Sequence, residues 1–427
     1  MKMKKIRILF FLLILLASVP AYSQVDTLTI DKCIDMAVKN NPQIKLAESN
    51  VELSASNLKS NSAPLYPQVS FQTGWTRNGG TSFIGPIVRE GYYNNYSYGF
   101  QLQQLVFDFG KTYSKISSSS DLNEASKQDY ISAEQNLILN TYIAYFSYLQ
   151  AQRVIKVSEE TLKQTEEHLK QANALFSVGR SPQFDVLKAK TDVDNAKVNL
   201  LSVESSLRIT KLQLENVLNT KLGDNFILKD NLEVSKDTVN EAGAIGTAMK
   251  NRPEIISSKY KVEAGKSQLT SAWTSNLPSI NISGGYNWKN YLLNTRFPDS
   301  WNLGVTLSLP LFQGFALDAG IDQARANLKN SEAQNELTVQ AVVLDVQQQY
   351  ANFQVALSKI SATKSLVEQS ALTLKTAEGR YAQGVGSPLE ITDAQVAYFN
   401  AQNLYIQTLY DYQVAYVRLQ RAMGILK

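Results

Sequence analysis

Apolar residues alternate with small polar residues in four short segments of the chain. The segments cover residues 68–76, 96–106, 279–288 and 301–311, and in each one face is apolar while the other carries Asn, Ser, Thr, Gln or Gly. A period of two over about ten residues is typical of β-strands with chemically different faces. We therefore expect two pairs of strands.

A different period follows each pair of strands. Neither Gly nor Pro occurs from Lys111 to Val178 or from Ile321 to Glu378, and apolar residues recur there every seven positions. A sustained heptad predicts long helices packed side by side. We expect long helices over about 111–177 and 316–383, each rising roughly 100 Å, and return helices over about 183–219 and 389–423. The heptad residues are Tyr148, Ile155, Leu162, Leu169 and Phe176, then Val186, Val193, Leu200, Leu207 and Leu214, with counterparts Phe353, Ile360, Val367, Leu374 and Tyr381, then Ile391, Tyr398, Tyr405, Tyr412 and Leu419.

The same order of elements occurs twice. Residues 37–42 match residues 248–253, an offset of 211, and Gly179 matches Gly384 at an offset of 205. A match that persists from about 37 to 219 indicates an internal duplication. The first structural repeat is expected over residues 24–228 and the second over 229–427.

The first 23 residues predict a signal peptide. They have a basic start, an apolar run from Ile8 to Ala17, and small residues at Ala21 and Ser23 before the cut. An N-terminal membrane anchor is the alternative, but the run is shorter than the roughly 20 residues of a span. Position 24 is Gln, so we expect no lipid on the mature N-terminus, and the exact cleavage site stays open.

Composition excludes several classes of chemistry. Of 42 Lys and Arg residues four lie in the first seven positions, and the remaining 38 equal the 38 acidic residues, so the charge does not indicate nucleic-acid binding. A single cysteine, Cys33, and a single histidine, His168, cannot form a disulfide framework or a multi-thiolate or histidine metal site. His168 is expected on a solvated helix face. We expect no enzyme, no cofactor and no metal.

Three features favour contact of the strands with lipid rather than with a soluble core. Their length matches the ~9–11 residues that a tilted strand needs to cross a bilayer. Trp75, Trp288 and Trp301 are expected at the strand ends near the loops, as an interfacial girdle. The polar faces carry no charge. The polar segments over about 77–95 and 289–300 are expected to be outer loops.

Four strands cannot close a barrel, and an open edge in lipid would leave backbone groups unpaired. Two copies would give eight strands, which side chains fill, whereas three copies give twelve. The sequence therefore predicts a homotrimer. A secreted coiled-coil scaffold or adhesin with a small soluble β-sheet is the alternative.

These elements resemble the TolC-type family of outer-membrane efflux and secretion channels over nearly the whole mature chain. The resemblance is carried by residues 28–30 with 37–42, by the strand-to-helix turns 107–111 and 312–314, and by the segments 179–187 and 381–394. It implies an α+β membrane protein, with a trimeric twelve-stranded transmembrane β-barrel, four strands per chain, continuing into a twelve-helix periplasmic α-barrel.

The resemblance also implies a function and partners. The protein would be a passive duct in the outer membrane of a Gram-negative bacterium, in contact with outer-membrane lipid. It would receive substrate from a periplasmic adaptor and a proton-driven or ATP-driven inner-membrane transporter. The exported substrate, the pump and the adaptor stay open.

The turns between long and return helices predict helix ends and starts. Gly179 and Gly384 end the long helices, Ser181 and Ser387 cap the return helices, and Pro182 and Pro388 occupy their first turns. Ser387 with Glu390 fits a capping box. The resemblance implies that these tips contact the adaptor, although simple turn residues would look the same. The expected contacts are Gly179, Arg180, Ser181, Gly384, Val385, Gly386, Ser387 and Pro388.

The resemblance further implies a gate at the periplasmic mouth. Glu390 and Asp393 would form two carboxylate rings that attract cations, while the alternative for Glu390 is that it only completes the helix cap. Asp185 and Tyr381 match two positions that latch the closed state. The arginine expected two residues after the tip glycine is replaced by Gly386, which leaves the latch an open question.

Overall fold

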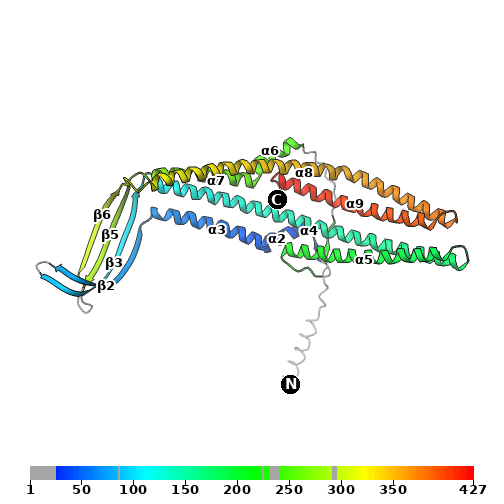
Figure 1. Ribbon diagram of the computed structural model, residues 1–427, viewed down its shortest axis with the longest axis horizontal. Helices are drawn as coiled ribbons and strands as arrows, with labels where there is room; N and C mark the ends of the chain where they lie inside the picture. Colours follow the sequence, from blue (N-terminus) through cyan, green and yellow to red (C-terminus); the bar gives the residue numbers. More distant parts are fainter. Residues whose placement is uncertain (1–25, 85–86, 224–225, 231–239, 291–295) are drawn as a thin grey trace, which may run out of the picture. The chain divides into compact units, whose positions relative to one another are not determined.

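The computed structural model describes residues 26–84, 87–223, 226–230, 240–290 and 296–427 (Figure 1). The predicted signal peptide lies outside these residues. The chain forms two compact units: residues 1–41, 137–237 and 353–417 make up unit 1, and residues 42–136, 238–352 and 418–427 make up unit 2. Each unit combines segments from both halves of the sequence. The compact units therefore differ from the predicted repeats, because helices from both halves pack together.

Unit 2 contains a four-stranded antiparallel sheet in the order β2-β3-β5-β6 (Figure 1). Helix α3 enters it through the short 3₁₀ turn Ala63–Leu65, and α6 and α7 precede its second pair of strands. The bounds are α3 Pro42–Ser62, β2 Gln68–Ile84, β3 Ile87–Phe107, α6 Glu241–Asn251, α7 Pro253–Thr274, β5 Ser279–Asn290 and β6 Asp299–Ser308.

The strand bounds correct the sequence prediction. The outer loop expected over 77–95 is instead strand over 77–84 and 87–95, and β2 and β3 pair residue by residue as far as Ile84 and Ile87. Polar side chains end the apolar pattern but leave the backbone able to pair, so the ladder continues. Strand β6 begins at Asp299 and ends at Ser308, not at 301 and 311. Pro310 follows shortly after, and proline has no N–H to donate to a ladder.

The two faces of the sheet differ as expected. Partners across the strands share a face, so Phe71, Phe100, Tyr286 and Trp301 form one row. These aromatic side chains are exposed, as are Val69, Leu303, Val305 and Leu307 on the same face. The opposite face is polar, and there Gln101 Nε2 donates to Asn287 Oδ1 at 3.0 Å. The sheet thus presents an apolar face to its surroundings.

Unit 1 is formed by long helices and a small parallel sheet. Helices α4 and α8 run through both units, and α5 and α9 return beside them. The bounds are β1 Asp26–Leu28, α2 Ile30–Asn40, α4 Lys111–Ser177, α5 Gln183–Leu218, β4 Phe226–Leu228, α8 Ala316–Ala382 and α9 Pro388–Ala422. The helix bounds lie within one residue of the predicted ones. The predicted heptad residues are buried or half-buried except Phe176, which is exposed.

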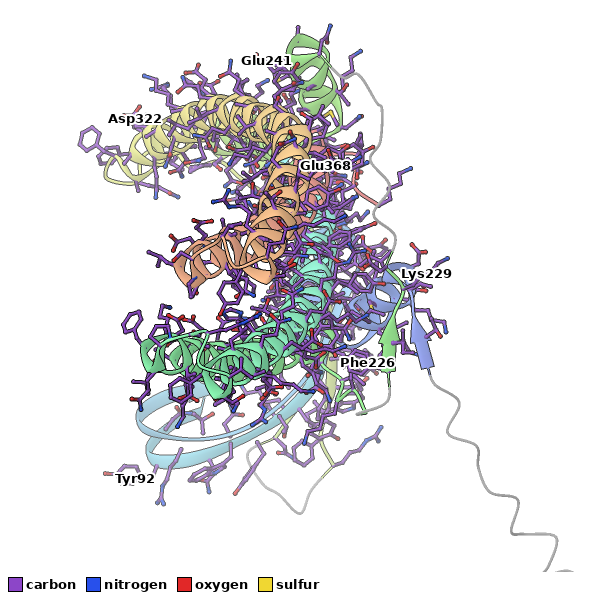
Figure 2. All side chains as sticks on the ribbon, turned by 90° about the vertical axis from the view of Figure 1, so that its right-hand side faces the viewer. Tyr92, Phe226, Lys229, Glu241, Asp322 and Glu368 are labelled. Carbon is purple, nitrogen blue, oxygen red and sulfur yellow. The ribbon has the colours of Figure 1, made fainter. Side chains whose placement is uncertain are left out.

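Aromatic side chains attach the small sheet to α4. Strands β1 and β4 lie side by side, with Phe226 at the start of β4 and Lys229 directly after its end (Figure 2). The rings of Tyr148 and Phe226 stack with centroids 5.2 Å apart. The Tyr145 hydroxyl donates to the backbone oxygen of Lys229 at 2.6 Å. Burial raises the pKa of Tyr145 well above its usual value, so the hydroxyl keeps its proton as a donor.

Equivalent positions in the two halves share unusual backbone conformations. Phe109 and Gly110 have φ of 55° and 87°, and Gly314 and Phe315 have φ of 59° and 65°. Both strand-to-helix turns therefore use two successive left-handed residues, with the glycine and the phenylalanine in opposite order. Glycine adopts this region freely, whereas phenylalanine needs support from its surroundings.

Candidate functional site

The site is built on the two turns that end the long helices of unit 1 (Figure 1). Gly179 and Gly384 take φ of 71° and 76°. The amide of each glycine donates to the residue three positions earlier, at 2.9 Å in both turns. The next amide donates five positions back, from Arg180 to Leu175 at 2.9 Å and from Val385 to Arg380 at 3.1 Å. The two turns have the same backbone construction, a glycine C-cap.

The helix starts after these turns follow the prediction in the second turn only. Ser387 Oγ accepts from the amide of Leu389 at 3.2 Å and caps α9, which begins at Pro388. The capping box is wrong, because the carboxylate of Glu390 pairs with Arg380 instead, at 3.3 Å from Nε to Oε2.

In the first turn the predicted serine cap is also wrong. Helix α5 begins at Gln183, and Pro182 occupies the cap position without a side-chain hydrogen bond. The Ser181 hydroxyl donates to the carboxylate of Asp185. A proline at the cap displaces the serine by one position, so its hydroxyl meets a side chain rather than the free amides of the helix.

An open groove of about 620 Å³ lies between α8 and α9 beside the second turn. Arg380, Glu390 and Asp393 contribute its charged side chains, and Leu372 and Ala377 are among its apolar ones. Asp393 is exposed, and no described ion pair involves it. The structure therefore brings the two predicted gate carboxylates to one groove, together with a cation that the sequence prediction did not include.

The predicted latch residues lie in a different setting. Tyr381 is buried in an apolar cluster with Leu374, Ile391 and Ala394. Burial, and then the charge of Asp185, raises the pKa of Tyr381. Its ring meets the ring of His168 edge to face, with centroids 5.5 Å apart. The Asp185 carboxylate accepts from Ser181, and the buried Tyr381 hydroxyl has no hydrogen-bond partner among the described residues, so the polar link that the resemblance implies for a latch stays a prediction.

The expectation of a solvated His168 is wrong. The residue is 7% exposed, because α4 turns it toward Tyr381 and away from the charged residues around it in sequence. Burial lowers the pKa of His168, and Lys188 adds to this, although the carboxylates of Asp192 and Asp185 oppose it. Sequence reasoning missed this contact because neighbours along a helix occupy different faces.

A polar contact joins α5 to α9 near the turns. Thr392 Oγ1 donates to Asp192 Oδ2 at 3.0 Å, and the ammonium group of Lys188 pairs with the same carboxylate. A smaller cavity of about 180 Å³ adjoins them, lined also by Thr165 and Phe399. Lys188, which occupies the Asp393 position in the first half of the sequence, is thus neutralised within its own chain.

The arginine that the resemblance implies at position 386 is replaced by glycine, and the structure shows what a side chain would meet there. A Cβ atom at Gly386 would lie 2.8 Å from the backbone nitrogen of Tyr381 and 3.0 Å from the carbonyl carbon of Arg380. Contacts that close to backbone are not tolerated without a shift of the turn. The turn therefore excludes an arginine at position 386 in this conformation.

The three predicted girdle tryptophans fall close together across the sheet. Trp75 pairs with Tyr96, Trp288 with Tyr98, and Trp301 with Tyr286. Trp75 lies in the middle of β2 rather than at its end, because β2 continues to Ile84. Tyr98 and Trp288 stack with ring centroids 5.0 Å apart. The tryptophans thus belong to one aromatic band that crosses the sheet near the C-terminal end of β5.

Two further properties concern the described residues alone. None of the helices among them combines the length and the apolarity that crossing a membrane requires. No three of their His, Cys, Asp or Glu side chains are grouped so as to hold a metal ion.

Solved structures of outer-membrane channel proteins have the same fold as this chain. The chain superimposes on the crystal structure of CusC with a TM-score of 0.81 and 20% identity, covering 92% of both chains. It superimposes on the open state of the MtrE outer membrane channel of Neisseria gonorrhoeae with a TM-score of 0.81 and 20% identity, covering 93% of this chain and 89% of that one.

The sequence places the chain in a family. It matches the family described as outer membrane efflux protein over residues 33–220 and 244–425, and it belongs to that family. It is 23% identical to the probable outer membrane lipoprotein SilC of Salmonella typhimurium, over 92% of this chain and 85% of that protein. It is also 23% identical to the outer membrane protein TolC of Escherichia coli, over 91% of this chain and 80% of that protein. The protein is therefore a TolC-type channel of the outer membrane.

Proposed function

We propose that the protein is the outer-membrane duct of a tripartite efflux or type I secretion system, working as a homotrimer. The observation that carries this proposal is the sheet of unit 2. Its apolar face is exposed, with Trp301, Leu303, Val305 and Leu307 between 65% and 75% exposed. Its outer strands, β2 and β6, each have one edge without a partner among the described residues. Such a sheet in lipid must close on further copies.

Three copies would close a twelve-stranded barrel. The apolar face would then meet lipid, and the polar face would line a wet lumen. That polar face consists of Gln101, Gly99, Gly285, Asn287 and their neighbours, and it is uncharged as far as Lys289, which pairs with Ser97 near the end of β5. Two copies would give eight strands, a width that side chains fill. Twelve strands therefore suit a duct better than eight.

The helices of the three copies would form the periplasmic part, with the tips at its mouth. Glu390 and Asp393 would line that mouth as a constriction that attracts cations. The tip residues, from Gly179 to Ser181 and from Gly384 to Pro388, would contact a periplasmic adaptor. Most of these residues are exposed, and Val385 is 65% exposed.

The duct would perform no chemistry of its own. A proton-driven or ATP-driven transporter of the inner membrane would supply the energy, and the adaptor would connect it to the tips. The polar lumen offers no preference for one substrate class, so selection would reside in the transporter. A secreted coiled-coil scaffold or adhesin stays the alternative, and the exposed aromatic band argues against it.

The proposed function is tested on the purified full chain. We expect a trimer that resists heating in detergent and a cation-selective conductance in planar bilayers. Replacing Asp393→Asn and Glu390→Gln together should lower the preference for cations, because it removes six carboxylates per trimer. Cross-linking in the native cells should recover an adaptor and an inner-membrane transporter. A monomer that extracts without detergent would favour the scaffold, and unchanged selectivity in the double variant would reject the gate.

A further inference from the structure

We propose that Arg380 sets the ionic selectivity of the periplasmic mouth, by neutralising Glu390 and leaving Asp393 as the carboxylate that attracts cations. This inference rests on the proposed function, because it assumes that the groove between α8 and α9 faces the conduction path. It assigns a residue that the resemblance did not imply.

The geometry places the cation beside one of the two gate carboxylates. Arg380 Nε lies 3.3 Å from Glu390 Oε2, and Arg380 Nη2 donates to the backbone oxygen of Val385 at 3.5 Å. The guanidinium group therefore spans the turn from α8 to α9. Both side chains are about half exposed, at 54% and 47%. An exposed pair adds little stability, so the consequence of this arrangement lies in its charge.

The first turn of the same chain shows that the backbone does not need this arginine. The position equivalent to Arg380 is Leu175, and both residues accept a turn hydrogen bond through their backbone oxygen. Leu175 packs against the apolar cluster around Tyr381. Two turns of equal construction thus carry an apolar side chain in one case and a cation in the other. In the first turn Asp185 occupies the position of Glu390 and Lys188 that of Asp393, so only the second turn combines two carboxylates with an arginine at the Arg380 position.

The turn cannot hold a cationic side chain at position 386. A side chain at Gly386 would meet the backbone of Arg380 and Tyr381. A long side chain in the last turn of α8 reaches the same region without that clash. Arg380 is accordingly the cation that this turn can bring to the mouth among its described residues.

The charge count gives a specific expectation. Each chain contributes two carboxylates and one guanidinium to the groove, so the net contribution is one negative charge per chain rather than two. Arg380→Gln should double this charge and strengthen the attraction of cations. Glu390→Gln should cancel this charge. Arg380→Gln combined with Glu390→Gln should restore the net charge of the unchanged protein.

The experiment measures reversal potentials of the purified trimer in planar bilayers under a KCl gradient. We expect Arg380→Gln to raise the permeability of K⁺ relative to Cl⁻ about threefold, the effect of three added charges under partial screening. Arg380→Gln with Glu390→Gln should return the ratio of the unchanged protein. Arg380→Lys, which keeps the charge, should leave it unchanged.

A matched control is available on the same helix. Arg325 is also exposed and paired, with Asp322 at 2.6 Å, but it lies near the start of α8. Arg325→Gln should not change the selectivity. Heat resistance of each trimer would show that the variants are assembled.

The outcomes separate this inference from the proposed function. If Asp393→Asn lowers cation selectivity while Arg380→Gln has no effect, the role of Arg380 is overturned and the duct stands. If Arg380→Gln raises the permeability of K⁺ relative to Cl⁻ but the combination of Arg380→Gln with Glu390→Gln does not return it to the original value, the pairing with Glu390 is overturned. If the unchanged protein forms no conductance at all, the proposed function itself fails.

Discussion

The ring of His168 is a titratable group buried near the helix tips. It is buried against Tyr381, and the groups around it are Asp185, Lys188 and Asp192 on α5. Burial lowers its pKa from the ordinary value of 6.5 in spite of the two carboxylates. The folded tip therefore binds a proton less readily than the unfolded chain does. Stability that depends on the neutral ring is present above pH 6.5 and is lost as pH falls through the lowered value.

We predict that the tips loosen in mild acid and that His168 is the cause. Hydrogen exchange over residues 165–190 and 375–395 should accelerate severalfold between pH 7.5 and 5.5, after correction for the intrinsic pH dependence of exchange. His168→Asn should remove that acceleration, because an amide cannot take up the proton. No other histidine occurs in the sequence, so another imidazole cannot explain the effect. An equal acceleration in the variant would contradict the prediction.

At the scale of elements, a charged cluster joins four helices in unit 2. Arg252, 6% exposed in its side chain, pairs with Glu254 of α7 at 2.9 Å and with Asp345 of α8 at 2.7 Å. Arg421 of α9 pairs with Glu254 at 2.8 Å, and Ser132 of α4 donates to the same carboxylate at 2.9 Å. Burial alone would raise the pKa of Glu254, but the two guanidinium groups lower it. Two cations and two anions thus balance at this junction.

Removing one member of the cluster should cost far more than removing an exposed pair. We expect Glu254→Ala to destabilise unit 2 by about 3 kcal/mol, because Arg252 stays buried with half of its counter-charge. The measurement is denaturant unfolding in detergent, followed by tryptophan fluorescence. The control is Glu263→Ala, on the same helix, whose exposed pair with Lys266 should contribute less than about 1 kcal/mol. Similar losses for both variants would show that the cluster is not held by buried charge.

At the scale of the whole molecule, the two faces of the sheet decide the environment of the protein. Leu303 of β6 is 70% exposed on the apolar face, and Thr306 lies on the polar face of the same strand. If three copies close a barrel in lipid, one of these positions meets hydrocarbon and the other meets water. A soluble sheet would place both in contact with water or protein.

A lysine at each position therefore distinguishes these environments. Leu303→Lys should destabilise the trimer, by an amount that rises with depth to about 2–4 kcal/mol per chain at the bilayer centre, and reduce the yield of heat-resistant trimer. Thr306→Lys should leave the trimer intact and change its conductance instead. The yield of trimer from outer membranes is compared by gel electrophoresis with and without heating. Equal tolerance of both lysines would argue against a lipid-facing sheet.

The sequence by itself determined the order of the paired strands, the long helices and the return helices, because helix and strand periods depend on neighbours along the chain. The heptads located α4, α5, α8 and α9 to within one residue, and the alternation identified the two faces of the sheet. The alternation missed the extension of β2 and β3 to Ile84 and Ile87, since a ladder depends on backbone pairing and not on side-chain polarity.

Only the tertiary structure decided which side chains meet. Arg380 and Glu390 are ten positions apart and lie on different helices, so no periodicity predicts their pairing; the glycine turn brings them together. His168 stands among charged residues in the sequence, yet α4 turns its ring toward Tyr381 of α8. The steric exclusion of a side chain at Gly386 likewise follows from the path of the turn. Local sequence patterns depend on the helix or strand to which a residue belongs. The burial of a side chain and the balance of its charge depend instead on the side chains of the neighbouring helix that contact it.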